Sequence, residues 1–165
     1  MSAYIQALLS LVRRTKQGLS EETFRIAKLL RAIREDYELN GEFDLGRLVL
    51  ASPDSDAQVC ADRTLVKMVL QNIVSNALSH TRGQVCVTLH ADHVEITDEG
   101  GATPTADIVD RSATVVEPQS VGLGLYIVNL ACERLGWLFE SGAQAGGGRV
   151  RIWFKKTGKR PDVLR

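Results

Sequence analysis

The spacing of apolar residues divides the chain into a helical first part and a mixed second part. Residues 3–38 carry apolar side chains at helical spacing, and Ser20 is placed to cap a second helix within this stretch. The pair Asn40-Gly41 marks the end of the pattern. We therefore predict a helical segment over residues 1–40, which is either a hairpin packed on the domain or the end of a dimerisation bundle.

From residue 41 onward, strand and helix periodicities alternate. Helices are predicted over 63–80 and 123–135, where apolar residues recur every three or four positions. Period-two alternation predicts six strands, at 43–51, 58–61, 84–90, 93–98, 137–141 and 149–155. This order predicts an α+β fold over residues 41–156, a two-layer sandwich of one mixed, mainly antiparallel sheet with helices on one face. Residues 157–165 are predicted to be a tail.

Composition narrows the classes of function. The chain has 165 residues, 44% of them hydrophobic, which is enough for one substantial core. Its 20 basic and 20 acidic residues balance, so no electrostatic feature supports a nucleic-acid partner. No apolar run reaches the roughly 20 residues that a membrane helix needs. Three cysteines without a Cys-x-x-Cys pair fit a reduced, cytoplasmic setting and do not suggest a zinc site.

The predicted helix at 63–80 carries a polar row. Asn72, Asn76 and His80 are each four residues apart and therefore share one helix face. An amide oxygen is a hard, neutral ligand that suits Mg²⁺, which also binds water and phosphate oxygens. The row is thus a candidate metal and phosphate site, and the alternative is a solvated helix face.

Asp98 ends the predicted strand 93–98. Because strand side chains alternate, Asp98 lies on the same side as Val94 and Ile96, which is the side facing the core. A carboxylate in that position needs a hydrogen-bond donor, and the exocyclic amine of adenine is one. Gly100 would let a flat ring approach the backbone. The alternative is an aspartate that caps a turn at the end of its strand.

The run Gly122-Leu123-Gly124-Leu125 opens the predicted helix at 123–135. The first turn of a helix has free N–H groups and a positive dipole end, which favour phosphate binding. The run is neither a P-loop nor a Rossmann fingerprint, and a plain glycine turn is the alternative. Residues 146–148 are predicted to form a plain hairpin turn, and His90 and His93 to be solvated surface residues.

Taken together, these motifs resemble those of the catalytic, ATP-binding domain of sensor histidine kinases, a family related to gyrase, Hsp90 and the mismatch-repair ATPases. The stretch 71–81 looks like the N box, residues 98–102 like the first glycine box, and residues 122–128 like the second. The loop 101–121 would be the ATP lid. The resemblance covers roughly residues 41–156, and residues 23–42 look like the end of a dimerisation helix and its exit into the catalytic domain.

The resemblance implies a Bergerat-type ATPase fold with ATP and Mg²⁺ as cofactors. It implies that Asn76 holds Mg²⁺ and Asn72 faces the phosphates, with both as catalytic residues, and that Asp98 reads adenine. The remaining nucleotide-binding residues that it implies are His80, Gly100, Ala102, Arg111, Gly122, Leu123, Gly124 and Leu125.

The sequence also departs from the family pattern. Ala102 replaces the second glycine of the first box, the lid lacks its phenylalanine motif, and Ser79 stands where many kinases have a lysine. The span 43–62 is short for the helix that the family usually has there. No His-Glu/Asp-x-x-Thr/Asn-Pro phosphoacceptor box is present.

The function expected from this resemblance is transfer of the γ-phosphoryl group of ATP to a histidine outside this chain. The expected partners are a dimerisation and phosphoacceptor domain and a response regulator, with a homodimer in the full-length protein. One alternative is a degenerate, non-catalytic module that binds a response regulator or a sister kinase. A further alternative is a serine kinase of the anti-sigma type.

Overall fold

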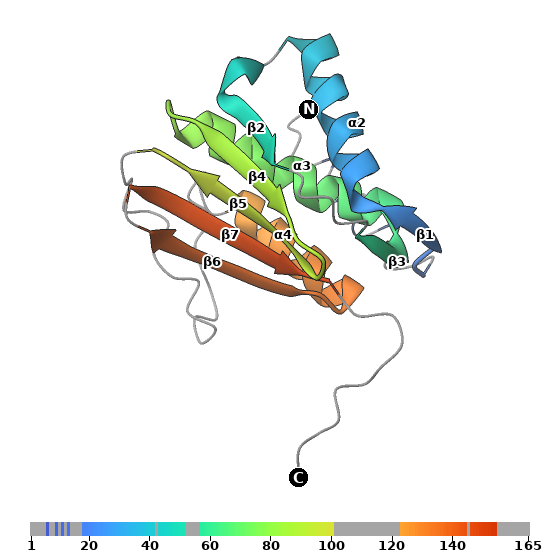
Figure 1. Cartoon of the computed structure of the whole chain (residues 1–165). Helices are drawn as coiled ribbons and strands as arrows, with labels where there is room; N and C mark the ends of the chain where they lie inside the picture. Colours follow the sequence, from blue (N-terminus) through green and yellow to red (C-terminus); the bar gives the residue numbers. More distant parts are fainter. Residues whose placement is uncertain are drawn as a thin grey trace.

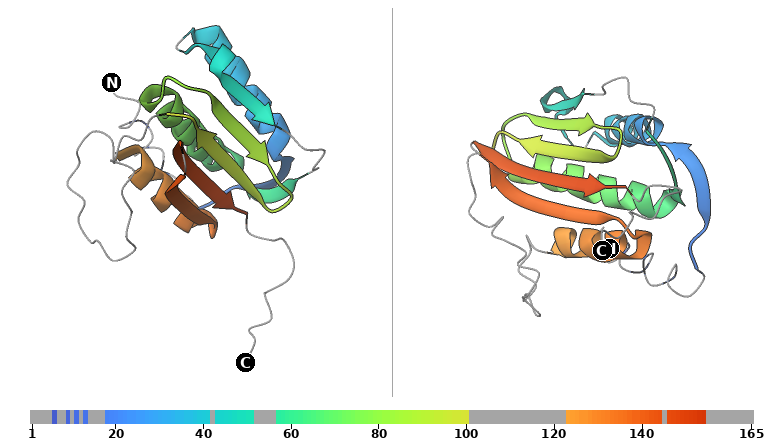
Figure 2. Two further views of the ribbon diagram at one scale, coloured as in Figure 1. Left: turned by 60° about the vertical axis from the view of Figure 1, so that its left-hand side comes forward. Right: turned by 60° about the horizontal axis from the view of Figure 1, so that its bottom comes forward.

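The computed structural model describes residues 18–41, 43–51, 57–100, 123–144 and 146–154, together with residues 6, 9, 11 and 13, which are helical. A five-stranded sheet carries helices α3 and α4 on one face, and α2 lies beside the edge strand β2 (Figures 1 and 2). The helices and strands are β1 Glu21–Arg25, α2 Ile26–Asn40, η1 Leu45–Arg47, β2 Leu48–Ala51, β3 Gln58–Asp62, α3 Arg63–His80, β4 Val85–Leu89, β5 His93–Asp98, α4 Leu123–Leu135, β6 Leu138–Gln144 and β7 Gly147–Trp153.

The large sheet has the strand order β2-β4-β5-β7-β6. Strands β2 and β4 are parallel, and the other three neighbouring pairs are antiparallel. The prediction of a mixed, mainly antiparallel sheet with helices on one face is therefore confirmed. A second sheet of two antiparallel strands, β1 and β3, lies apart from it.

Helix α3 is the centre of the core. Its N-cap is Asp62, which is 1% exposed and whose Oδ1 accepts the N–H of Leu65 at 3.1 Å. The other carboxylate oxygen, Oδ2, accepts the N–H of Ser20 at 3.1 Å. The side chains that α3 buries are Leu65, Val66, Val69, Leu70, Ile73, Val74 and Leu78. Complete burial of each apolar side chain contributes about 1.5–3 kcal/mol, so the sequence holds this helix firmly in place.

The second helix predicted within residues 3–38, with Ser20 as its cap, does not include residues 21–25. These residues form β1, which pairs with β3 from Glu21 opposite Asp62 to Arg25 opposite Gln58. Ser20 therefore caps no helix, and α2 begins at Ile26 without a side-chain cap. The prediction was wrong because pairing with β3 outweighs the helix propensity of the glutamates.

Helix α2 packs on the domain. The Tyr37 hydroxyl donates to the Gln71 carbonyl of α3 at 2.9 Å, and Lys67 of α3 pairs with Asp36 at 2.8 Å. Gly41 ends the helix in the left-handed conformation, with φ 64°, as the Asn40-Gly41 pair predicted. Of the two expectations for the segment, this packing favours a helix packed on the domain. Among the described residues of 43–62, the only helix is the short η1.

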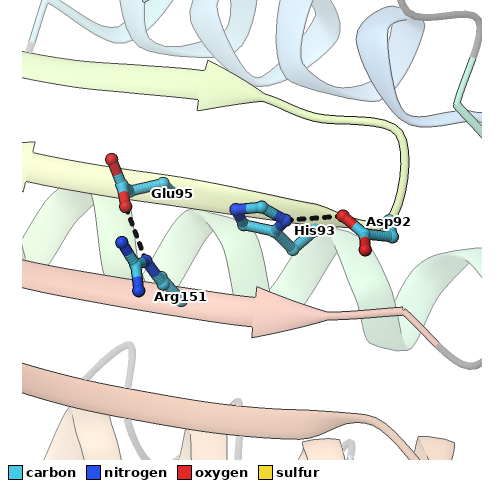
Figure 3. A network of polar contacts seen from close by, with 4 residues as sticks. All are labelled: Asp92, His93, Glu95 and Arg151. Carbon is cyan, nitrogen blue, oxygen red and sulfur yellow. Dashed lines mark hydrogen bonds and ion pairs between the residues drawn. The ribbon is translucent and has the colours of Figure 1, made fainter.

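Two other local expectations changed. The strand predicted over 43–51 is confined to β2, because Asp44 accepts the N–H of Gly46 at 3.0 Å and turns the chain into η1. His93 is not a freely solvated residue, since its ring stacks on Trp153 at 4.1 Å and its Nδ1 lies 2.7 Å from Asp92. Figure 3 shows this pair beside the ion pair of Arg151 with Glu95 on neighbouring strands β7 and β5.

Candidate functional site

Asp98 ends β5 with its carboxylate held by two backbone amides. Val94 and Ile96 are 0% and 2% exposed, and Asp98 continues their side of the strand, as predicted. Its Oδ1 accepts the N–H of Gly100 at 3.1 Å and the N–H of Gly148 at 3.2 Å. Within the part of the chain that the structure describes, Oδ2 accepts no hydrogen bond. The carboxylate is therefore fixed in orientation and has one oxygen available to a donor on a ligand.

Glycines surround this carboxylate at close range. A Cβ atom on Gly148 would lie 2.9 Å from Asp98 Oδ2, and one on Gly147 would overlap the Asp98 carbonyl oxygen. These two residues were expected to form a plain hairpin turn, but they begin β7 and lie against Asp98. Only Gly146, with φ 90°, has the backbone of a turn glycine. The glycines are thus required by the close approach of β7 to the end of β5.

Thr81 ends the stretch 71–81 that resembles the N box, but it was not predicted to be a site residue. It follows the last residue of α3, is 7% exposed, and its Oγ1 accepts the N–H of Gly83 at 3.1 Å. A Cβ atom on Gly100 would lie 2.7 Å from the Thr81 Cβ atom and overlap its Oγ1. The turn after α3 therefore lies directly against the turn after β5. The signal in the sequence was its place at the end of the N-box-like stretch, whereas its burial is visible only in the structure.

The polar row of α3 is only partly buried. Asn72 and Asn76 are half-buried and His80 is exposed. The Asn72 side-chain amide donates to the Met68 carbonyl one turn earlier at 2.8 Å, so its Oδ1 is the atom left to meet a ligand. Asn76 makes no side-chain hydrogen bond to any described residue. Two amide oxygens on one helix face can therefore accept a metal, a water or a donor.

Helix α4 begins at Leu123, and its next turn is fixed in the core by Ile127 and Val128, both 0% exposed. It packs against α3, and its first turn presents backbone N–H groups that no preceding helical residue can pair. Leu125 is half-buried. Gly122, Ala102, Arg111 and the rest of the expected lid at 101–121 lie outside the described residues.

The elements that carry these residues meet at one end of the molecule. The end of α3, the end of β5, the end of β6 and the start of β7 lie toward the left of Figure 1, where α4 also begins. The second view in Figure 2 shows α3 and α4 on the same side of the sheet. The structure thus brings Asp98 and Gly100 to the end of α3 and adds Thr81 and Gly148 to the residues that the sequence indicated, while Asn72 and Asn76 lie earlier along the same helix.

The comparisons agree with this geometry. The model of the family described as histidine kinase-, DNA gyrase B-, and HSP90-like ATPase matches residues 61–158. Comparison with curated proteins found no match. The cytoplasmic segment of histidine kinase QseC is 18% identical with a TM-score of 0.65, and 93% of this chain and 89% of that one are covered. The catalytic domain of histidine kinase ThkA is 20% identical with a TM-score of 0.65, covering 85% and 99%.

A third similar structure is full-length ShkA in complex with AMPPNP, at 23% identity and a TM-score of 0.69. The similar region covers 91% of this chain and 34% of the ShkA chain. At these identities the structures establish the shared fold. The family match spans more than half of the chain, and the chain therefore belongs to the histidine kinase-, DNA gyrase B- and HSP90-like ATPases. The expected family and its α+β ATPase fold are confirmed.

Proposed function

We propose that this chain is the ATP-binding catalytic domain of a sensor histidine kinase, which transfers the γ-phosphoryl group to a histidine on another domain or molecule. The observation that carries the proposal is the Asp98 carboxylate. Two amides hold one of its oxygens, and the other has no donor among the described residues. The exocyclic amine of adenine is a donor that fits this oxygen. Gly100 supports the site by letting Thr81 pack beside the carboxylate, because a Cβ atom on Gly100 would overlap the Thr81 Oγ1.

The α3 row suits the phosphate end of the same ligand. Asn76 is half-buried with an unengaged amide oxygen, which is the hard ligand that Mg²⁺ accepts alongside water and phosphate oxygens. When bound, Mg²⁺ would neutralise phosphate charge. We assign Asn76 as the metal ligand and Asn72 as a residue facing the phosphates, with His80 at the rim of the row.

The first turn of α4 would hold phosphate oxygens through its free N–H groups, which include those of Leu123, Gly124 and Leu125. Catalysis by these residues is mainly positioning and charge stabilisation, and no residue of the chain needs to form a covalent intermediate. Gly122, Ala102 and Arg111 are proposed to complete the site from the lid side.

The acceptor histidine is proposed to lie outside this chain. The chain has three histidines, of which His80 is exposed on α3 while His90 and His93 stack on each other at 4.2 Å beside the β4–β5 turn. None lies in a phosphoacceptor box. We propose as partners a dimerisation and phosphoacceptor domain, a response regulator and a second copy in the full-length protein, all in the cytoplasm. Among the described residues, no helix is long and apolar enough to cross a membrane.

Ala102 and the missing lid phenylalanines support a second candidate, a kinase-like module that binds nucleotide weakly or not at all and acts by binding a response regulator or sister kinase. Calorimetric titration with ADP, with and without Mg²⁺, tests nucleotide binding directly. Incubation with γ-labelled ATP and a separate dimerisation domain with an intact acceptor histidine then tests transfer. Acid-labile label on that domain supports a histidine kinase, and acid-stable label supports a serine kinase. If the protein does not bind ADP, the proposal of an ATP-binding kinase is overturned in favour of the non-catalytic module.

A further inference from the structure

Arg47, the last residue of η1, makes three hydrogen bonds to the end of α3 and the turn that follows it. Its Nη1 donates to the carbonyl oxygens of Thr81 at 2.7 Å and Gly83 at 3.2 Å, and its Nη2 donates to the Leu78 carbonyl at 3.1 Å. The last carbonyls of a helix have no partner within the helix. A guanidinium presents several donors in one rigid plane, so Arg47 alone satisfies carbonyls from both the helix end and the turn.

The sequence around Arg47 holds it in this position. Asp44 caps η1 by accepting the N–H of Gly46, and the N–H of Arg47 donates to the Asp44 carbonyl at 3.3 Å. The next residue, Leu48, is 3% exposed and stands opposite Val85 in the parallel pair of β2 and β4. Because β2 and β4 run in the same direction, the residues just before each strand lie side by side. Arg47 is therefore placed next to the turn that precedes β4.

That turn contacts the end of β5. A Cβ atom on Gly83 would lie 3.0 Å from the Glu99 carbonyl oxygen, and the Glu99 N–H donates to the Gln84 carbonyl at 3.0 Å. Thr81 packs against Gly100, whose N–H donates to Asp98. A continuous series of contacts thus joins the guanidinium of Arg47 to the carboxylate of Asp98.

From this geometry we infer that Arg47 is a positioning residue for adenine recognition, which acts by fixing the turn at residues 81–83 against the turn that orients Asp98. The inference rests on the proposed nucleotide site. Arg47 does not itself touch the nucleotide, and it lies outside the residues that the family model matches. Removing its side chain would leave three carbonyls without their donor and would free the turn to move relative to Gly100.

The test compares Arg47→Ala with Arg34→Ala. Arg34 is a matched control because its Nη1 also donates to a backbone carbonyl, that of Leu48, at 3.4 Å, but it makes no hydrogen bond to the 81–83 turn. Calorimetry would measure the affinities of ADP and of inosine diphosphate, which carries an oxygen in place of the adenine amine. The ratio of the two affinities reports recognition by Asp98, whereas general loosening of the fold weakens both ligands alike.

Arg47→Ala should lower the preference for ADP over inosine diphosphate about tenfold, which corresponds to about 1.4 kcal/mol, and Arg34→Ala should leave it unchanged. Arg47→Lys should recover part of the preference, since an ammonium is a point donor that cannot span three carbonyls. An unchanged preference in folded Arg47→Ala would overturn the inference.

A second measurement separates this inference from the proposed function. The amide ¹H–¹⁵N signals of Gly100 and Gly148 report the hydrogen bonds to Asp98 without any ligand. If wild-type protein binds neither nucleotide or does not prefer ADP, the adenine site itself is refuted. The positioning role of Arg47 is then tested by the chemical shifts of these two amides, which should change in Arg47→Ala and stay unchanged in Arg34→Ala. Unmoved signals in Arg47→Ala would overturn it.

Discussion

Replacement of Asp98 by asparagine should abolish adenine recognition while sparing the fold. In the wild type, Oδ1 accepts two N–H groups, from Gly100 and Gly148, and Oδ2 has no donor among the described residues. The asparagine oxygen can keep both glycine hydrogen bonds. Its NH₂ group must then take the place of Oδ2, where it would face the adenine amine donor to donor.

The size of the effect follows from what this exchange removes. The variant loses one charge-assisted hydrogen bond and leaves a ligand donor unpaired in the site. Together these cost about 2–4 kcal/mol, or roughly 30- to 1000-fold in affinity. The fold should change little because the two glycine N–H groups retain an acceptor.

Calorimetric titration with ADP measures the loss, and thermal denaturation monitors the fold. Asp62→Asn is the matched control, because Asp62 also accepts two backbone N–H groups, from Leu65 and Ser20, but lies at the opposite end of α3. It should lower stability and leave ADP affinity close to that of the wild type. Equal ADP affinities of wild type and Asp98→Asn would remove Asp98 from the pocket.

Three further outcomes are expected. Asn76→Ala should keep Mg²⁺-free binding of ADP but lose most of the gain in affinity that Mg²⁺ provides, and a full gain in calorimetry would refute the assigned ligand. Gly147→Ala should lower the free energy of unfolding in urea by about 1–3 kcal/mol, because its Cβ would overlap the Asp98 carbonyl. Gly142→Ala, which meets no atom within 4 Å, should have little effect, and equal effects would contradict the contact. Burial, followed by the charge of Glu133, raises the pKa of Cys132 from 9.0 to about 12. The unfolded thiol therefore ionises first, so this residue's contribution to stability is complete below pH 9 and declines as the pH rises toward 12. Mass spectrometry after alkylation at pH 8 should find native Cys132 unmodified, and rapid modification would contradict its burial.

The parts of the fold with strong local signals could be predicted from the sequence. Helix α3 has a capping aspartate and an apolar face of seven buried residues, and its predicted bounds of 63–80 match those observed. Strand β5 likewise has its buried residues at every second position. In both elements the local pattern and the tertiary packing favour the same structure.

The errors arose where a distant partner decides the structure. Residues 21–25 have glutamates that favour a helix, but they pair with a strand about forty residues later. Gly147 and Gly148 have the composition of a turn, and only Asp98, fifty residues earlier than Gly148, requires them to lack side chains. Arg47 donates a hydrogen bond to the backbone carbonyl of Thr81, and a contact with a backbone atom cannot be inferred from the types of the two residues.

The hydrogen bond from Gly148 to Asp98 also has a consequence for the order in which the protein folds. It joins residues 50 positions apart, and closing so long a loop is entropically costly and slow. Helix α3 can gain its local contacts well before β7 pairs with β5, so the second donor to the carboxylate should arrive late. A ligand that requires this carboxylate would then bind after the main folding barrier. Nucleotide should accordingly slow unfolding far more than it speeds folding, and it would protect the finished domain without assisting its formation.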